Sequence, residues 1–214
     1  MKRLILTISF FILLTILQSQ NPVDTLWTRT FGGNELDWGH SIQQTIDGGY
    51  IITGITMSYG PDVSAVWLIK TDPDGIEEWN QTFGGNSMDA GYSVQQTNDE
   101  GYIIGGMTYS FGAGENDIWI IKTDTDGIEE WNQTFGGSFA DNGTSIKQTI
   151  DGGFIISGHT QIVENGEYDI LLIKINANGT EEWTQTFGGA ESEYCQDVIQ
   201  TNDDGFIICG TTRS

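Results

Sequence analysis

Short apolar stretches recur along the chain, each bounded by residues that favour turns. In residues 92–97 apolar and polar side chains alternate, which predicts a strand with one buried face. Residues 102–106 form a continuous apolar run rich in isoleucine, which favours a buried strand. Residues 117–123 and 128–135 predict two further strands, and clusters of Asp, Asn and Gly mark the turns between them. Within this period no stretch shows the spacing of an amphipathic helix.

The phrase Thr-Phe-Gly-Gly occurs four times at a fixed spacing of 52 residues, with its phenylalanines at Phe31, Phe83, Phe135 and Phe187. A fixed period of roughly 20–50 residues is typical of solenoids, propellers and similar arrays. Four short antiparallel strands in each period match the plan of a β-propeller blade. A β-sandwich or an ordinary barrel is the competing interpretation, but neither fold requires regular copies of one unit. The sequence therefore predicts an all-β β-propeller built from four 52-residue repeats.

The chain divides into a predicted leader and the repeats. Lys2 and Arg3 precede an apolar run at residues 4–17, which is the pattern of a secretory signal peptide. We therefore expect a signal peptide at residues 1–20 and a protein that is secreted or held at the cell surface; an uncleaved N-terminal anchor is the alternative. The propeller is expected over residues 21–214, with repeats at 27–78, 79–130, 131–182 and 183–214.

The last repeat is incomplete. Residues 27–31 match an outermost strand that no blade precedes, and the fourth repeat supplies strands only at 196–201 and 206–212. Its third strand is missing, so the first segment cannot complete an antiparallel blade at the end of the chain. We expect an open or partial propeller whose exposed edges favour self-association with another chain.

Several motifs carry a resemblance to a known family. Thr-Phe-Gly-Gly at 82–85, Asp89 and the block Gly-Tyr-Ile-Ile-Gly-Gly-Met-Thr at 101–108 resemble the repeat of secreted bacterial β-propellers, the seven-bladed β-propeller repeat type, and are kelch-like. The resemblance covers residues 27–212. It implies that the strand at 92–97 is innermost and the Trp-containing strand outermost. Only the second repeat keeps both glycines, Gly105 and Gly106.

The charge of the chain restricts its partners. It has 30 acidic and 8 basic residues and a net charge of -22, which disfavours nucleic acid and anionic membranes. Repeated turns such as Asp47-Gly48 and Asp124-Thr125-Asp126-Gly127 have the composition of hydrogen-bonded turns. Calcium binding is the alternative for these turns, although they lack the further ligands of a calcium loop. No other cofactor is expected.

Two sets of residues are candidates for ligand binding. One is a column of acids before each predicted inner strand: Asp37, Asp89, Asp141 and Glu193. These acids either ring a channel that binds a cation or polar ligand, or hold the preceding Gly-Gly turn through backbone N–H groups. The other set lies in the variable loops between second and third strands: Tyr59, Asp62, Phe111, Glu115, Asn116, Glu164 and Glu167. Variable loops on a repeated scaffold favour a carbohydrate or protein ligand, and unconstrained drift is the alternative.

Other recurring residues predict structural roles. The column Trp27, Trp79, Trp131 and Trp183 is expected to pack between blades, and Lys70, Lys122 and Lys174 are expected to pair with acids in the nearby turns. Cys195 and Cys209 lie across a predicted hairpin, where a disulfide is geometrically open to them.

Catalytic motifs are missing from the sequence. There is no metal-ligand spacing, nucleophile elbow or phosphate loop, and the paired glutamates lie on the predicted outer strand. The sequence favours a non-enzymatic binding, adhesion or structural module. The alternative is a domain of a larger polysaccharide-acting enzyme whose catalytic residues lie outside this chain.

Overall fold

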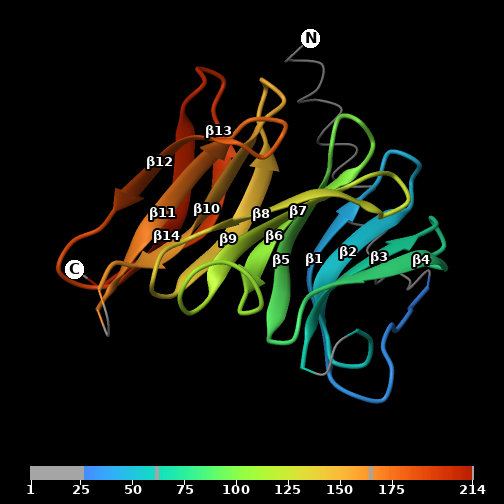
Figure 1. Ribbon diagram of the computed structural model, residues 1–214. Helices are drawn as coiled ribbons and strands as arrows, with labels where there is room; N and C mark the ends of the chain where they lie inside the picture. The colour runs from blue at the N-terminus through green and yellow to red at the C-terminus, as the bar shows by residue number, and fades with distance from the viewer. Residues whose placement is uncertain (1–26, 61–62, 164–165, 214) are drawn as a thin grey trace, which may run out of the picture.

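All regular structure in the computed structural model is β-strand over the residues that it describes, 27–60, 63–163 and 166–213. Three antiparallel sheets have four strands each, and a fourth sheet has two (Figure 1). The first strands of successive sheets begin 52 residues apart, which confirms the predicted all-β repeat architecture. The predicted signal peptide, residues 1–20, lies outside the described residues.

The strands pair in chain order within each sheet. Sheet 1 contains β1 (Asp37–Gln44), β2 (Tyr50–Thr56), β3 (Ala65–Thr71) and β4 (Glu77–Phe83). Sheet 2 contains β5 (Asp89–Gln96), β6 (Tyr102–Thr108), β7 (Asp117–Thr123) and β8 (Glu129–Phe135). Sheet 3 contains β9 (Asp141–Gln148), β10 (Phe154–Gln161), β11 (Tyr168–Ile175) and β12 (Glu181–Phe187). Sheet 4 contains β13 (Glu193–Gln200) and β14 (Phe206–Thr212).

The first strand of each sheet begins earlier than its alternation predicts. β5 starts at Asp89 rather than at Tyr92. The pairing register shifts between Gly91 and Ser93, which marks a β-bulge. A bulge inserts one extra residue and breaks the alternation of side chains between the two faces. The sequence pattern therefore stops at the bulge although the strand continues through it.

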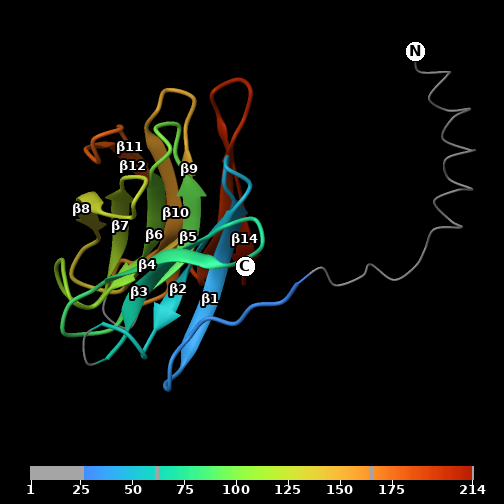
Figure 2. The same ribbon diagram turned by 90° about the vertical axis from the view of Figure 1, so that its right-hand side faces the viewer.

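The sheets stack side by side with their first strands adjacent. β1, β5, β9 and β13 contact one another in series, so they form the inner side of the array. Figure 2 shows the strands of sheets 2 and 3 following outward from β5 and β9 to β8 and β12. Among the described residues β14 pairs only with β13 and β1 only with β2, so the sheets do not close into a ring. This agrees with the expected open arrangement.

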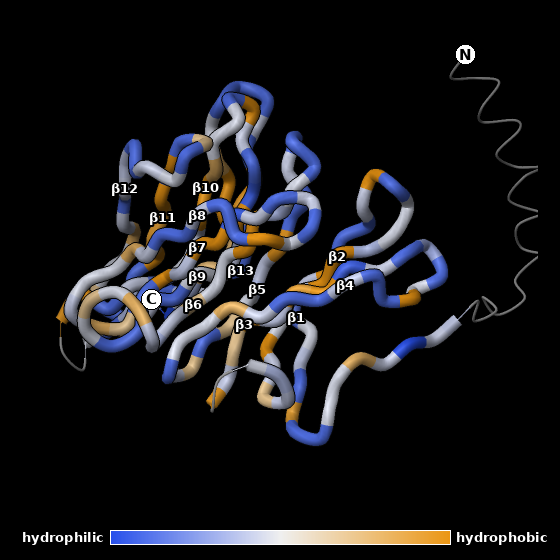
Figure 3. The backbone as a smooth tube through the Cα atoms, turned by 45° about the vertical axis from the view of Figure 1, so that its right-hand side comes forward, coloured by the Kyte–Doolittle hydropathy of each residue, from blue (hydrophilic) through white to orange (hydrophobic). Residues whose placement is uncertain are grey.

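The core lies between successive sheets. Ile51 on β2 and Leu68 on β3 share a buried cluster with Val94 on β5 and Ile104 on β6. The same positions recur in the next two interfaces, as Ile103 with Ile146 and as Ile155 with Val198. Figure 3 shows the apolar residues concentrated on the strands inside the array and the polar residues on the connecting loops. Each interface thus packs the second strand of one sheet on the first strand of the next.

The tryptophan column packs between sheets, as predicted. Trp79 on β4 meets Tyr102 of sheet 2 edge to face, with ring centroids 5.7 Å apart. Trp27, which precedes β1, meets Tyr50 in the same manner at 5.8 Å. The contact recurs between Trp131 and Phe154 and between Trp183 and Phe206. The segment that begins at Trp27 therefore takes the place of an outer strand beside sheet 1, although it forms no strand itself.

Three lysines are buried where the third strands end. Lys70 is 3% exposed and donates to Asp47 Oδ2 and Glu78 Oε2, both at 2.8 Å, and to the Thr71 carbonyl at 3.0 Å. All three ammonium hydrogens are thus used, and the β1–β2 turn and β4 are both tied to β3. Lys122 repeats the bridge with Asp99 and Glu130, and Lys174 with Asp151 and Glu182. The predicted ion pairs are confirmed.

Trp131→Ala should destabilise the protein more than Trp27→Ala. Trp131 joins the core cluster between sheets 2 and 3, whereas Trp27 packs only at the end of the array. Because Trp131 is half-buried, we expect a loss of up to about 3 kcal/mol for its removal. Urea unfolding of both variants measures the difference. Equal midpoints would contradict packing between neighbouring sheets.

Asp47→Asn should destabilise the protein at pH 7 and much less at pH 2. The hydrogen bond from Lys70 lowers the pKa of Asp47 to about 2. The pKa of an unfolded Asp is about 3.9, so the Lys70–Asp47 pair stabilises the protein fully above that pH. This stabilisation is lost as the pH falls through about 2. Since the Asp47 side chain is 56% exposed, solvent screening limits the loss at pH 7 to about 1 kcal/mol.

Urea unfolding at neutral and acid pH measures this dependence. The matched control is Asp74→Asn, which changes an exposed acid in the neighbouring turn. A destabilisation by Asp47→Asn that stays constant down to pH 2 would show that its charge is not responsible.

Candidate functional site

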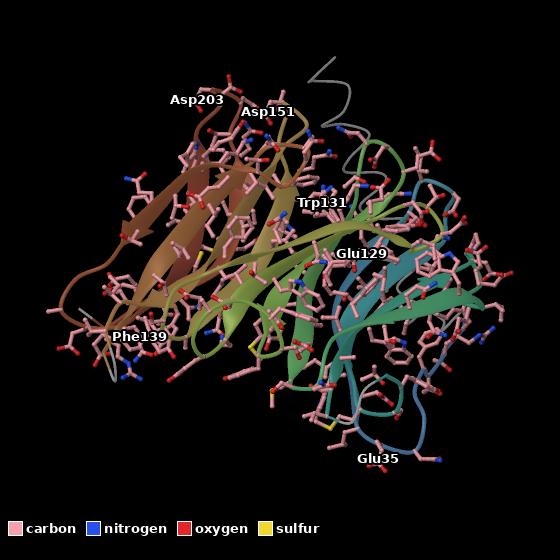
Figure 4. All side chains as sticks on the ribbon, in the orientation of Figure 1. Glu35, Glu129, Trp131, Phe139, Asp151 and Asp203 are labelled. Carbon is pink, nitrogen blue, oxygen red and sulfur yellow. The ribbon has the colours of Figure 1, made fainter. Side chains whose placement is uncertain are left out.

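The two ends of the sheets carry different residues. At one end lie the turns between first and second strands, which include Asp151 and Asp203 (Figure 4). At the other end lie the segments that lead into each first strand, which include Glu35 before β1 and Phe139 between sheets 2 and 3 (Figure 4). The loops between second and third strands share this second end, because Tyr109 N donates to Met88 O and Asp141 N to Asn116 O. We call it the loop end, and we call the opposite end, which carries the turns that follow the first and third strands, the turn end.

The column of acids lies at the loop end, on the first residue of each inner strand. Each carboxylate accepts the N–H of the second glycine in the preceding Gly-Gly pair. The pairs are Asp37 with Gly33 at 3.0 Å, Asp89 with Gly85 at 2.8 Å, Asp141 with Gly137 at 2.8 Å and Glu193 with Gly189 at 3.1 Å. The turn-holding interpretation of these acids is confirmed.

Hydroxyl groups satisfy the other oxygens of these acids. Thr56 donates to Asp37 Oδ1 at 2.6 Å, whereas Ser58 donates at 2.7 Å to Oδ2, which also accepts from Gly33. Burial alone would raise the pKa of Asp37, but the hydrogen bonds from Thr56, Ser58 and the backbone leave it lowered. Asp89 and Asp141 are buried, and their carboxylates are already engaged in hydrogen bonds that hold the Gly-Gly turns.

The predicted loop residues fall into distinct environments. Tyr59 and Phe111 pack on the aromatic rings of their own sheets, while Asn116 is buried and donates to Asp141 O at 2.7 Å. Glu115 and Glu167 are exposed, and Glu167 accepts a hydrogen bond from Ser192. Asp62 and Glu164 lie outside the described residues. The structure thus gives Asn116 a buried role that its place in a variable loop did not indicate.

In sheets 1 and 2, an aromatic residue of the loop between the second and third strands packs on a tryptophan of the third strand. Tyr59 lies 5.4 Å from Trp67, and Phe111 lies 5.2 Å from Trp119, measured between ring centroids. The indole N–H of Trp119 donates to Asn132 Oδ1 at 3.1 Å, and Trp67 bonds to Asn80 in the same way at 3.2 Å. Tyr59 and Phe111 also lie beside Gly33 and Gly85, in the Gly-Gly pairs that precede the first strands.

Sheet 3 lacks this filling and has a cleft instead. Leu171 stands where the other sheets have Trp67 and Trp119, and Val163 replaces the loop aromatic. A cleft of about 650 Å³ lies there, against β8, β11 and β12. It is lined by Thr134, Phe135, Gly136, Gly137, Ser138, Phe139, Asp141, Thr160, Gln161, Ile162, Leu171, Ile173, Glu181, Thr184 and Thr186.

The neighbouring loop is also held differently in sheet 3. In sheet 2, Ser110 donates to Asp89 and accepts from Ser87 N, which brings the loop over Gly85. Ile162 replaces this serine in sheet 3 and is exposed. A Cβ added at Gly85 would lie 2.6 Å from Ser110, whereas one at Gly137 would meet nothing within 4 Å. The loop therefore leaves Gly137 uncovered at the mouth of the cleft.

The cleft combines an apolar floor with uncharged and acidic polar groups. Leu171, Ile173 and Phe135 supply apolar surface, and no Lys, Arg or His lines it among the described residues. Burial raises the pKa of Asp141, against the hydrogen bonds from Thr160 and Gly137 that favour its ionised form. Such a cleft accepts a ligand with apolar faces and hydroxyl groups, and it repels an anion. The presence of Leu171 where the first two repeats have Trp67 and Trp119 is the sequence signal that could have revealed it.

The turn end shows hydrogen-bonded turns at the repeated Asp residues. Asp72 Oδ1 accepts the N–H groups of Asp74 at 2.9 Å and Ile76 at 2.8 Å. Asn176 makes the same pair of bonds in sheet 3 without a charge. This confirms the turn interpretation. No cluster of three or more His, Cys, Asp or Glu residues suited to a metal occurs in the described part of the chain.

The disulfide that the sequence left open between Cys195 and Cys209 is not formed. Cys195 is a buried free thiol and Cys209 an exposed one. A register shift between Cys195 and Asp197 places Cys209 opposite Asp197 and Cys195 opposite Gly210. The β-bulge thus takes the two thiols out of register, which the sequence alternation did not show.

In the folded protein, one thiol should react rapidly with a thiol reagent and the second only after unfolding. Cys209 is exposed, whereas burial excludes reagent from Cys195 and raises its pKa. Titration with and without denaturant counts the two groups. Cys209→Ser should remove the rapid reaction, and equal rates for both thiols in the wild type would contradict this placement.

Comparison with known proteins adds no family assignment. No family model matches the chain, and no curated protein matches it significantly in sequence. Over the residues that the structure covers, no helix is long and apolar enough to cross a membrane.

Proposed function

We propose that this chain is an exported, non-enzymatic β-propeller, open at its ends, that binds a neutral carbohydrate in the cleft of sheet 3. The four stacked sheets, with inner first strands and outer Trp-containing strands, support the propeller architecture. The apolar run at residues 4–17 supports export to the cell surface or beyond. The resemblance to secreted bacterial propeller repeats fits both points.

The cleft is the observation that carries the binding proposal. Sheet 2 has the pair Phe111–Trp119 at the equivalent position, and in sheet 1 the pair Tyr59–Trp67 leaves a smaller cavity of about 210 Å³ beside Trp67. The larger opening in sheet 3 accompanies the replacement of both aromatic residues. A binding site on a rigid repeat is expected where one copy departs from the others. The stacked sheets on both sides keep the walls of the cleft in place.

The lining favours a sugar over other ligands. The C–H faces of a pyranose ring are apolar and suit the rings of Phe135 and Phe139. Its hydroxyl groups find partners in Thr184, Thr186 and Gln161. A sulfated or carboxylated glycan would meet Asp141 and Glu181 without a cation to pair with, so we expect neutral glycans to bind best.

A second candidate is a polysaccharide-acting enzyme with carboxylates in this cleft, in contrast to the sequence-based alternative, which places the catalytic residues outside this chain. Two carboxylates, Asp141 and Glu181, line one cleft, and the pKa of Asp141 is raised by burial. Glycosidases use paired carboxylates with separated pKa values. Asp141 is already engaged by Gly137 and Thr160, which favours the binding role. Release of reducing ends from a bound polysaccharide by this chain would favour the enzyme.

Filling the cleft should abolish glycan binding without unfolding the protein. The double variant Leu171→Trp with Val163→Tyr restores the aromatic pair that sheets 1 and 2 already accommodate. A glycan array identifies ligands of the full chain, and calorimetry measures their affinity before and after the change. Unchanged affinity in a variant with unchanged circular dichroism and unfolding midpoint would exclude the cleft as the site.

Phe139→Ala should weaken binding by about tenfold, which corresponds to roughly 1.4 kcal/mol for one lost ring contact. The matched control is Glu35→Ala, at the same loop position beside sheet 1 (Figure 4). If both variants bind as the wild type does, the wall of the cleft does not contact the ligand.

A further inference from the structure

The inner strand of sheet 1 has an apolar face that the other sheets cover. Ile42 on β1 is 63% exposed. Its counterparts, Val94 on β5, Ile146 on β9 and Val198 on β13, are 5%, 0% and 1% exposed. The preceding sheet covers each of these three, and no sheet precedes β1 among the described residues. We call this surface of β1 the first face.

The opposite end of the array carries the other half of the same contact. Ile207 on β14 is 57% exposed, whereas Ile51, Ile103 and Ile155 at the same position are all 0% exposed. Those three isoleucines are the groups that cover Val94, Ile146 and Val198. The surface of β13 and β14 around Ile207, which we call the last face, therefore has the shape that covers an inner strand.

Polar groups repeat the same relation. Gln96 Oε1 accepts the N–H of Ile46, from the turn of the preceding sheet, at 2.8 Å. Its own Nε2 is fixed to Glu100 O at 3.1 Å. Gln148 and Gln200 accept in the same way from Asn98 at 2.9 Å and Ile150 at 2.8 Å. In each of sheets 2 to 4, the glutamine that ends the first strand thus accepts a hydrogen bond from the first turn of the preceding sheet.

Gln44 on the first face is already set in this arrangement. Its Nε2 donates to Gly48 O at 3.1 Å, as Gln96 does to Glu100. The turn N–H that corresponds to Ile46, Asn98 and Ile150 in sheet 4 is that of Asn202. A last face placed over a first face would bring Ile207 to Ile42 and the Asn202 N–H to Gln44 Oε1.

On this side of sheet 1 the chain covers Tyr50 of β2 and leaves the first face uncovered. Trp27 packs on Tyr50 as Trp79 packs on Tyr102, so the chain itself supplies the outer strand position beside sheet 1. The inner part, opposite β1, stays open. β13 and β14 are a first and a second strand, and these are the strands that cover an inner strand in each internal interface. The last face therefore provides the part that the first face lacks.

We propose that a second copy of this chain docks head to tail, with β13 and β14 of one copy on β1 of the next. The occupant follows from continuity with the internal interfaces, since the two end faces are the separated halves of a contact that the chain makes three times. Such a contact is heterologous, because different surfaces meet, and it builds a ring or a filament.

The contact should be weaker than the internal interfaces. Sheet 4 ends at β14 in the described structure, so no third strand accompanies it. A cavity of about 210 Å³ beside Phe31, Ile52 and Ile69 marks the space that a third strand would fill. Both copies also carry a charge of -22 and repel each other. Association should therefore rise with protein concentration and with salt, which screens the repulsion.

Light scattering and sedimentation of the full chain test the proposal. We expect the wild-type mass to rise with concentration, and more so in about 500 mM than in about 20 mM NaCl. Ile42→Asp and Ile207→Asp should each stay at the mass of one chain, since each lacks one half of the contact. Ile128→Asp, which changes an exposed isoleucine in a turn of sheet 2, should associate as the wild type does.

Mixing the two end variants gives the decisive result. Ile42→Asp keeps its last face and Ile207→Asp keeps its first face, so the mixture should form a species of two chains and nothing larger. Three outcomes would overturn the proposal: a wild type of one-chain mass at all concentrations, self-association of Ile42→Asp alone, or a mixture that stays at the one-chain mass. Circular dichroism establishes that both variants, which change exposed side chains, remain folded.

Discussion

The burial of one second-strand isoleucine under the next sheet is the contact on which this structure depends. A sheet with two apolar faces cannot bury them alone, so each sheet is stable only between neighbours. Ile51 covers Val94, and the same contact recurs twice along the chain. The arrangement also explains the ends of the array. A linear series of such contacts always leaves one covering residue and one uncovered partner, here Ile207 and Ile42.

The buried lysines add a second layer of order within each sheet. Lys70 links the first turn, the third strand and the fourth strand through two carboxylates and a carbonyl. Removing one partner of a buried charge destabilises the protein, because it leaves the other charge unpaired. The bridge therefore fixes how these strands lie relative to one another. With the scaffold held at the turn end, the loop end can vary. Sheet 3 uses this freedom, since the replacement of a tryptophan by Leu171 opens a cleft while the strands beneath stay in register.

The sequence predicted the contacts that columns of identical residues make, and it missed the β-bulges and the one place where a repeat differs from the others. Strand order, the tryptophan contacts and the lysine pairs follow from columns of identical residues, which report one local geometry several times. The start of β5 was not predictable, because the bulge at Gly91 breaks the alternation on which strand recognition rests. The same kind of bulge moves Cys195 and Cys209 out of register. The cleft was not predicted because it arises where Leu171, Val163 and Ile162 leave open a space beside β8. The absence of a side-chain contact produces no recognisable motif in a sequence.

The negative net charge of -22 limits which partners the exposed surfaces can bind. The structure places six basic residues, Arg29, Lys70, Lys122, Lys147, Lys174 and Arg213, and three of these lysines are buried beside carboxylates. Little positive charge therefore reaches the surface, and an approaching anion or a second copy meets a negative field. A contact between copies must gain its free energy from apolar burial such as that of Ile42 and Ile207. An anion is likewise disfavoured in the cleft, because the described walls offer hydroxyls, an amide and carboxylates but no Lys, Arg or His. The same negative charge therefore leaves apolar packing as the source of attraction between the ends and disfavours anionic ligands at the cleft.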